Sequence, residues 1–439
     1  MDINTQNKNN QTINIRKQLK KSFLGVGVMR LLNIPIGLVT SVLLARIFGP
    51  EQFGQYAFIM AIIPLLLIPV SGGLKTLLIR EVAAYKHDKN WPLYKGIMRS
   101  AYLWVFVISL LIYISYFLLT YTFKVVPSSE KWAYLPLGLI LLPIMGISAV
   151  RNAAIKGLGL PAISELSGAI IQPILFLFFI ASAVLIFTIS IESALLSQIF
   201  SSLLALILVT IIFLKVSPTD AKSVKAEVNL KYWGAALAPF MALNLIGTFN
   251  SQIGILALGM LGSDEQAAGL RVAERGAQFV SLSLTIVNLV ISPHIVNAYK
   301  SDNRLFLQKL SRQSARVAFC FALPIGLMLL IFGKELIALL FGSEYSELSY
   351  MPMFILVIGQ LFNVFFGSVG YLLAMTGNEK QSFKAQIFSV FISIALSILL
   401  IPKMGAIGAA IAVSTGIVVW NSILGFLVYK KIGIRPSAM

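Results

Sequence analysis

Long apolar runs alternate with short polar segments along the whole chain. Each run holds roughly 20 or more residues, the length that an α-helix needs to cross the hydrocarbon core of a bilayer. None of the runs alternates apolar and polar residues with a period of two, as the strands of a membrane β-barrel do. The pattern predicts an all-α polytopic membrane protein with twelve transmembrane helices, centred near Gly37, Leu65, Leu110, Ile144, Leu175, Leu203, Ile246, Ser281, Leu323, Leu361, Ser389 and Ile417.

The composition agrees with this class. Hydrophobic residues make up 58% of the chain and charged residues 12%, and the mean hydropathy is +0.86. In a soluble globular domain about a quarter of the residues are charged, so that class is excluded. The sequence contains no Gly-x-x-x-x-Gly-Lys-Ser/Thr motif, and its loops hold no catalytic triad or zinc-ligand pattern. It therefore predicts a membrane protein that is not an enzyme and needs neither a metal nor a cofactor.

The net charge of +18 could indicate a nucleic-acid partner, but the placement of the basic residues argues for a different origin. If both termini are cytoplasmic and the twelve spans alternate, most of the 35 Lys and Arg residues lie on the cytoplasmic side. Such a bias is the positive-inside rule. The charge is then a topology signal for a multi-pass protein of the bacterial cytoplasmic (inner) membrane, and no nucleic acid is expected. The basic residues at or near the outer face are Arg46, Lys124, Lys131, Lys334 and Lys403.

Two segments far apart in the chain resemble each other. The segment from Val82 to Asp88 matches that from Val296 to Asp302 at five of seven positions, with an offset of 214. This internal repeat predicts two six-helix lobes with the same orientation, related by a pseudo-two-fold axis along the membrane normal, with a substrate site between them. The expected boundaries are a disordered cytoplasmic N-terminus (1–14), an N-terminal lobe (15–216), a cytoplasmic linker (217–227), a C-terminal lobe (228–431) and a cytoplasmic tail (432–439).

The eighth span carries the strongest functional signal. Arg271, Glu274 and Arg275 lie on one face of the predicted helix, and a cation near the bilayer centre costs at least about 2.5–3.5 kcal/mol. One interpretation is a local Arg–Glu–Arg network that only holds helices together. The other is an anion site, in which Glu274 orients two guanidinium groups that suit phosphate oxygens.

Further polar residues line the seventh and eighth spans at helical spacing. Asn244, Thr248 and Gln252 lie in the seventh span, and Gln278 and Asn288 continue the polar face of the eighth. Such residues either hydrogen-bond between helices or line a cavity where amides and hydroxyls bind a sugar. The sequence leaves both interpretations open.

Four residues of the N-terminal half extend the candidate site. Arg30 lies within the first span with Asn33 on the same face, and it either lines the cavity or extends toward the cytoplasm. The same two alternatives hold for Lys75 in the second span. Glu165, at the inner start of the fifth span, is a candidate for ion coupling or a residue that stabilises a helix N-terminus.

Several motifs resemble the polysaccharide-transporter family. They are Leu44-Ala-Arg-Ile-Phe-Gly-Pro-Glu-Gln-Phe-Gly-Gln-Tyr56 at the first turn, Gly157-Leu-Gly-Leu-Pro161 after the fourth span and Gly405-Ala-Ile-Gly-Ala-Ala-Ile-Ala412 at the twelfth. This family comprises the Wzx-type O-antigen and capsule flippases of the multidrug/oligosaccharidyl-lipid/polysaccharide exporter superfamily. The resemblance covers essentially the whole chain.

The resemblance implies a V-shaped pair of six-helix lobes that moves undecaprenyl-diphosphate-linked oligosaccharides, such as O-antigen or capsule units of lipopolysaccharide and polysaccharide biosynthesis, from the inner to the outer leaflet. It implies that the diphosphate binds to cavity cations, here Arg30, Arg271, Arg275 and Lys75. The expected partners are the lipid-linked substrate, membrane lipids, a polysaccharide polymerase and a chain-length regulator. The alternative is a multidrug or organic-ion antiporter of the related exporter family, whose cavity should contain acidic residues.

Overall fold

The computed structural model describes residues 3–124, 130–186, 190–301 and 303–438, and within these ranges it contains helices and no strand. The first part of the chain forms α1 (Ile3–Leu67), η1 (Ile68–Gly72), α2 (Gly73–His87), α3 (Trp91–Phe117), η2 (Leu118–Thr122), α4 (Glu130–Ala133), α5 (Leu135–Leu139), α6 (Leu141–Gly157), α7 (Pro161–Leu166), η3 (Ser167–Ile171), α8 (Gln172–Ile186), α9 (Ile191–Val216) and α10 (Asp220–Ser223). The second part forms α11 (Leu230–Leu261), α12 (Asp264–Lys300), α13 (Arg304–Phe341), α14 (Ser343–Phe366), α15 (Val369–Met375) and α16 (Glu379–Ile432). The three η segments are single π-helical turns inside longer helices.

Nine segments of the described residues are long and apolar enough to cross a membrane, so this is a multi-pass membrane protein. Two of them, Gly25–His87 and Glu379–Ile432, contain 63 and 54 residues, more than twice the length that one crossing needs. Each of these two folds back on itself at a glycine and provides two crossings. With α12, which packs among them, the architecture is compatible with twelve crossings. The helix α1 also continues back to Ile3, through the polar segment for which the sequence predicts disorder.

The two reversals are sharp because glycine permits backbone angles that other residues rarely adopt. Gly49 in α1 has φ 69° and ψ 176°, and Gly405 in α16 has φ 53° and ψ −128°. Both positive φ angles would bring a Cβ atom into steric conflict with the backbone. Pro50 follows Gly49 directly, at the first position of the second helix, where its missing N–H and fixed φ are tolerated. Each pair of antiparallel spans is therefore joined without a loop.

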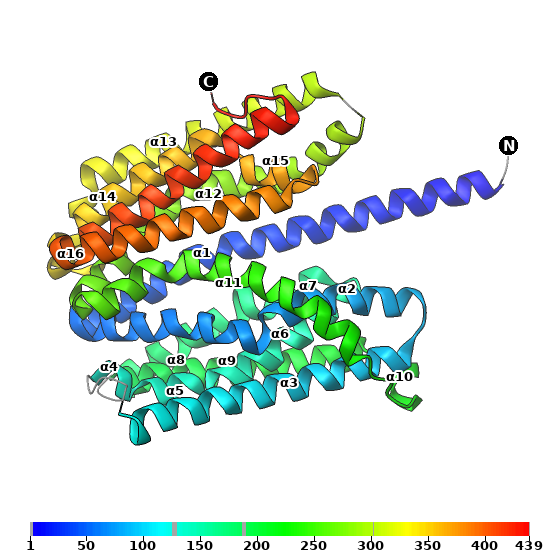
Figure 1. Cartoon of the computed structure of the whole chain (residues 1–439), viewed down its shortest axis with the longest axis horizontal. Helices are drawn as coiled ribbons and strands as arrows, with labels where there is room; N and C mark the ends of the chain where they lie inside the picture. The colour runs from blue at the N-terminus through cyan, green and yellow to red at the C-terminus, as the bar shows by residue number, and fades with distance from the viewer. Residues whose placement is uncertain (1–2, 125–129, 187–189, 302, 439) are drawn as a thin grey trace.

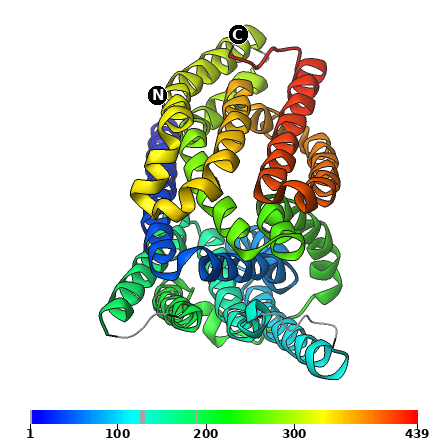
Figure 2. The same ribbon diagram turned by 90° about the vertical axis from the view of Figure 1, so that its left-hand side faces the viewer.

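The helices form two groups with α1 and α11 between them (Figure 1). In the view of Figure 2 the helices coloured yellow to red lie at the top and the cyan and blue-green ones at the bottom. Within the first group α6 packs against α2, α3 and α9, and within the second α12, α13, α14 and α16 pack against one another. The helix α1 packs mainly on α12, whereas α11 packs on both α2 and α16. The lobe boundaries expected from the repeat stay a prediction.

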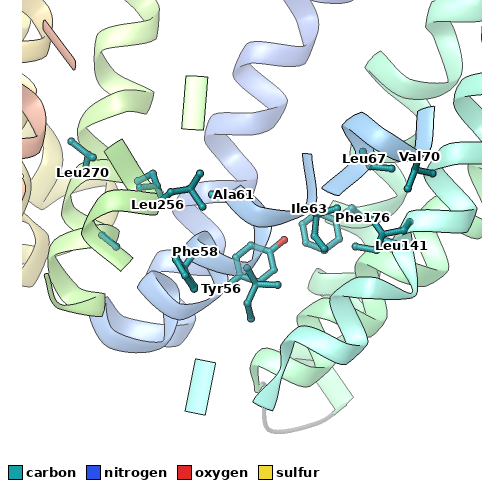
Figure 3. Close-up of a cluster of buried hydrophobic side chains, with 14 of the residues drawn as sticks. Tyr56, Phe58, Ala61, Ile63, Leu67, Val70, Leu141, Phe176, Leu256 and Leu270 are labelled. Carbon is teal, nitrogen blue, oxygen red and sulfur yellow. The ribbon is translucent and has the colours of Figure 1, made fainter. Parts of the chain in front are cut away.

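An apolar core fills the region where the groups meet. Phe58 of α1 is fully buried, and its ring meets the ring of Trp132 edge-on with a centroid distance of 5.4 Å. Figure 3 shows Phe58, Tyr56 and Ala61 beside Leu256 of α11. A Cβ atom at Gly259 would overlap the Phe58 ring, so α11 can approach α1 this closely only with glycine at that position.

The two groups are tied together at the end that holds Gly49 and Gly405. There Lys131 of α4 forms an ion pair with Asp264 at the start of α12, at 2.7 Å, and donates to the Gly259 carbonyl at 2.8 Å. Tyr345 donates to the carbonyl of Ala45 at 3.0 Å. At the opposite end it is α11 that joins the first group, since the Trp233 indole donates to the Tyr85 hydroxyl at 2.9 Å. The molecule is thus closed where Lys131 and Asp264 meet.

We expect Asp264→Asn to destabilise this closed end. The side chains of Lys131 and Asp264 are only 12% and 18% exposed, so removing one charge leaves the other without a partner and partly desolvated, which costs on the order of 1–3 kcal/mol. The apparent melting temperature of the purified protein should fall by about 2–4 °C. The matched control is Glu347→Gln, because Lys334 and Glu347 are 49% and 77% exposed and exposed pairs contribute little. An equal fall in melting temperature in both variants would contradict the stabilising role of the Lys131–Asp264 pair.

Candidate functional site

The polar face of α12 is directed at α1 and into the space between the two groups. The helix begins at Ser263, whose side chain accepts from the Gln266 backbone N–H while Gln266 reaches back to the Ser263 N–H. This capping box fixes the first turn. From there the helical period places Arg271, Glu274 and Arg275 on one face, while Val272 and Ala273 are buried against neighbouring helices.

Both arginines connect α12 to α1. Arg271 forms an ion pair with Glu274 at 3.2 Å and donates to the carbonyl of Ala57 at 3.4 Å. Arg275 donates through Nε to the Ser41 hydroxyl at 3.0 Å and through a terminal nitrogen to Gln278 at 3.3 Å. Glu274 thus pairs with Arg271, Arg275 has neutral partners, and the cluster has a net positive charge.

Two cavities meet at these arginines. The first, about 370 Å³, lies on the side of the N-terminal helices, and the second, about 460 Å³, on the side of α14 and α16. We call them the N-side and C-side cavities. They share Gln252, Arg271 and Arg275 as lining residues. The two guanidinium groups thus lie on the boundary between two polar spaces.

A third cavity of about 330 Å³ continues from the N-side cavity and contains Lys75, Lys156 and Glu165. It shares Gly168 and Gln172 with the N-side cavity. Lys156 and Glu165 form an ion pair, so these three residues also have a net positive charge. The polar residues therefore follow one path from the C-side cavity to Lys75.

An apolar cavity of about 720 Å³ lies beside this path. Residues of α1, α3, α11 and α16 line it, among them Leu65, Tyr116 and Ile398. Ile253 belongs to both the apolar cavity and the C-side cavity, and the preceding residue, Gln252, lines both polar cavities. Polar and apolar spaces are consequently separated by little more than one turn of α11.

The candidate residues from the sequence divide into two sets. Asn33, Gln252, Gln278, Lys75 and Glu165 line the polar cavities together with the α12 cluster, and Asn33 also donates to the carbonyl of Ala169 at 2.8 Å.

Three further candidates, Asn244, Thr248 and Asn288, do not line these cavities. Asn244 donates to the carbonyl of Phe240 in its own helix at 2.8 Å, and neither it nor Thr248 or Asn288 lies among the lining residues of the three polar cavities. Arg30 belongs to α1, but its side chain lies outside the described residues.

Sequence reasoning missed several lining residues. Gln360 and Asn363 of α14 and Trp420 of α16 line the C-side cavity, as does Asn250 of α11. Gln360 and Asn363 have the i, i+3 spacing of a polar stripe in an apolar span, which is a detectable signal. Nothing in the sequence indicates which other span that stripe faces.

The architecture is that of known membrane transporters. An inward closed form of the lipid II flippase MurJ matches with a TM-score of 0.74 at 15% identity, covering 92% of this chain and 87% of that one. An inward-facing multidrug resistance MATE family transporter of the MOP superfamily matches with a TM-score of 0.73 at 14% identity, covering 93% and 98%. At these identities the likeness shows the fold, which is that of the MurJ and MATE exporters.

The sequence places the chain in a family. The model of the family described as "Polysaccharide biosynthesis protein" matches residues 19–298, more than half of the chain, and the chain belongs to this family. It is 28% identical over 128 residues to the capsular polysaccharide biosynthesis protein CapF of Staphylococcus aureus, covering 29% of this chain and 32% of that one. It is 22% identical over 178 residues to the probable low-salt glycan biosynthesis flippase Agl15 of Haloferax volcanii, covering 40% and 37%. The matched segment spans about a third of each of these relatives.

We expect Glu274→Gln to destabilise the protein, because it leaves Arg271 without its ion-pair partner. Since Arg271 and Glu274 are 15% and 17% exposed, the cost should be on the order of 1–3 kcal/mol. Thermal unfolding of the purified protein measures it. The control is Glu335→Gln, an exposed carboxylate of α13, which should leave the melting temperature unchanged. A Glu274→Gln variant as stable as the parent protein would argue against a stabilising role of the Arg271–Glu274 pair.

Proposed function

We propose that the protein is a flippase that moves undecaprenyl-diphosphate-linked oligosaccharides, the repeat units of a capsule or O-antigen, from the inner to the outer leaflet by alternating access. The observation that carries the proposal is the pair Arg271 and Arg275 at the boundary of two polar cavities. A diphosphate must lose much of its hydration to enter such a space. Guanidinium groups offset this cost, since hydrogen bonds to charged partners contribute about 1.5–3 kcal/mol each.

The cations along the polar path support an anionic headgroup. Arg271, Arg275, Lys75 and Lys156 line the three polar cavities, against Glu274 and Glu165 as the carboxylates in those linings. Both carboxylates are already engaged by a basic partner. An exporter of organic cations would need free acidic groups in this place, so the multidrug antiporter has less support.

The apolar cavity supports an amphipathic substrate. A lipid-linked oligosaccharide combines a polar headgroup with a long hydrocarbon chain, and transfer of that chain into water would cost about 0.8 kcal/mol per CH₂ group. A transporter for such a molecule therefore needs apolar surface next to its polar site. Ile253 and Gln252 of α11 lie on the two sides of such a boundary.

The names of the matched relatives support the same pathway. One is a capsular polysaccharide biosynthesis protein and the other a probable glycan flippase. We infer a bacterial inner-membrane location with both termini in the cytoplasm. We also infer that the two arginines form one site with Arg30, Asn33, Lys75 and Gln278. The inferred partners are a polysaccharide polymerase and a chain-length regulator. Because the end with Lys131 and Asp264 is closed, the structure would represent a state that is not open to the outside.

The orientation can be tested by cysteine labelling. We expect a membrane-impermeant maleimide to label Ser343→Cys from outside intact cells, and to label Ser223→Cys only after the membrane is broken, in a background with Cys320→Ser. Both serines are exposed, and α10, which contains Ser223, lies at the same end of the molecule as the N-terminus in Figure 1. Labelling of Ser223→Cys in intact cells would reverse the proposed topology.

We expect Arg271→Ala or Arg275→Ala to abolish surface polysaccharide while the protein still reaches the membrane, because a buried diphosphate would lose its partner. Lysine at either position should restore part of the export, since it keeps the charge but loses the bidentate geometry. Quantitative surface-glycan staining of a deletion strain complemented by each variant measures the effect.

The matched control for these variants is Arg316→Ala. Arg316 lies on α13 outside the cavities and donates to the carbonyl of Ala438 at 3.0 Å, so export should be close to normal. Full export by a strain with glutamine at both position 271 and position 275 would overturn the proposal.

A further inference from the structure

The C-side cavity is unusually rich in carboxamide side chains. Asn250 and Gln252 come from α11, Gln278 from α12, and Gln360 and Asn363 from α14. Amides are uncharged and provide both donors and acceptors, and in a membrane-spanning protein such groups are placed at a cost. Five of them around about 460 Å³ require an explanation beyond helix packing.

These amides keep hydrogen-bonding capacity on the cavity side of the protein. Asn363 donates to Gln360 Oε1 at 3.1 Å, and Gln278 Oε1 accepts from Arg275. Three atoms of these amides make no hydrogen bond to any described residue. They are Gln360 Nε2, Asn363 Oδ1 and Gln278 Nε2. Carboxamide atoms without a partner are free to bond to a ligand, so a molecule with hydroxyl groups would complete the cavity.

The N-side cavity uses its amides differently. Asn33 donates to the Ala169 carbonyl at 2.8 Å, and Gln172 donates to the Ser202 hydroxyl at 2.8 Å. These two amides join helices of the N-terminal group to one another. The lining of that cavity also includes Phe53, Met60 and Phe176, which offer no hydrogen bonds.

The part of the ligand that contacts the amides of the C-side cavity should carry no positive charge and be rich in hydroxyl groups. The carboxylate in its lining, Glu274, is paired with Arg271, so an organic cation has no counter-charge there. Among the described residues no cluster of three His, Cys, Asp or Glu side chains could hold a metal ion. Amides that accept and donate beside a large aromatic ring, here Trp420, match the hydroxyl groups and the apolar faces of a sugar ring.

We propose that the C-side cavity binds the sugar residues next to the diphosphate, with Gln360, Asn363 and Trp420 as their contacts. The inference rests on the proposed function, because it takes the diphosphate to lie at Arg271 and Arg275, which line this cavity too. The cavity has the volume of an ordinary small-molecule site, so it selects the first sugars of the chain. The selection is made by residues of α14 and α16, whereas the diphosphate lies at the arginines that border both the N-side and the C-side cavity.

A comparison of the binding of two lipids tests the sugar site independently of the diphosphate site. One is undecaprenyl diphosphate, and the other is the undecaprenyl-diphosphate-linked oligosaccharide that accumulates in cells lacking this protein. Their affinities for the purified full-length protein in nanodiscs should differ by about tenfold or more in favour of the glycosylated lipid, as expected for two or more additional hydrogen bonds.

The double variant Gln360→Ala with Asn363→Ala should lose this preference and bind both lipids with the affinity that the parent protein has for the sugar-free lipid. Trp420→Leu, which keeps an apolar side chain and removes the aromatic face, should weaken only the glycosylated lipid and provides a second test if the double variant does not fold. The matched control is Asn244→Ala, an amide of α11 outside the cavities, which should keep the full preference.

The outcomes distinguish this inference from the function on which it rests. If the parent protein binds both lipids equally, or if the double variant retains the preference, the sugar site is wrong and the diphosphate site stands. If Arg275→Gln binds the sugar-free lipid as tightly as the parent protein does, the diphosphate site is wrong, and the sugar site that depends on it is wrong as well.

Discussion

The cost of a charge in a low-dielectric medium determines the arrangement of this protein. Arg271 and Arg275 lie on a helix that is surrounded by apolar spans, and each must have polar partners or water. Ser41, Ala57, Glu274 and Gln278 supply the hydrogen bonds. Because two of these four partners belong to α1, the arginines also fix how α1 and α12 approach each other. The N-side and C-side cavities lie on the two sides of this contact, and the polar path that joins them passes the two arginines.

The same contact lies close to the closed end of the molecule. Lys131 with Asp264 and Tyr345 with Ala45 hold the two groups of helices together there. In the transport cycle that we propose, opening of this end would break these contacts and separate α1 from α12 around the arginines. A diphosphate bound there would take over the hydrogen bonds that Ser41 and Ala57 provide, which would couple binding of the headgroup to that separation.

Much of the fold follows from the sequence, because hydrophobic length and helical period are local properties. The apolar runs, the turn at Gly49 and the polar face with Arg271 and Arg275 could all be identified without coordinates. The contribution of α14 and α16 to the C-side cavity could not, since Gln360 and Trp420 are on spans whose neighbours depend on tertiary packing. For the same reason the sequence could not distinguish Gln252, which lines the cavities, from Asn244, which bonds to its own helix.

The position of α11 has a consequence for how the chain is assembled in the membrane. Its first turn is attached to a preceding helix through Trp233 with Tyr85, and the segment just before it through the Glu227 backbone N–H, which donates to the Pro92 carbonyl at 3.0 Å. During synthesis the N-terminal segments emerge and fold first, so the nascent α11 meets a finished partner surface before α12 exists. Once it is anchored there, α11 offers a template on which α16, which is made later, can dock.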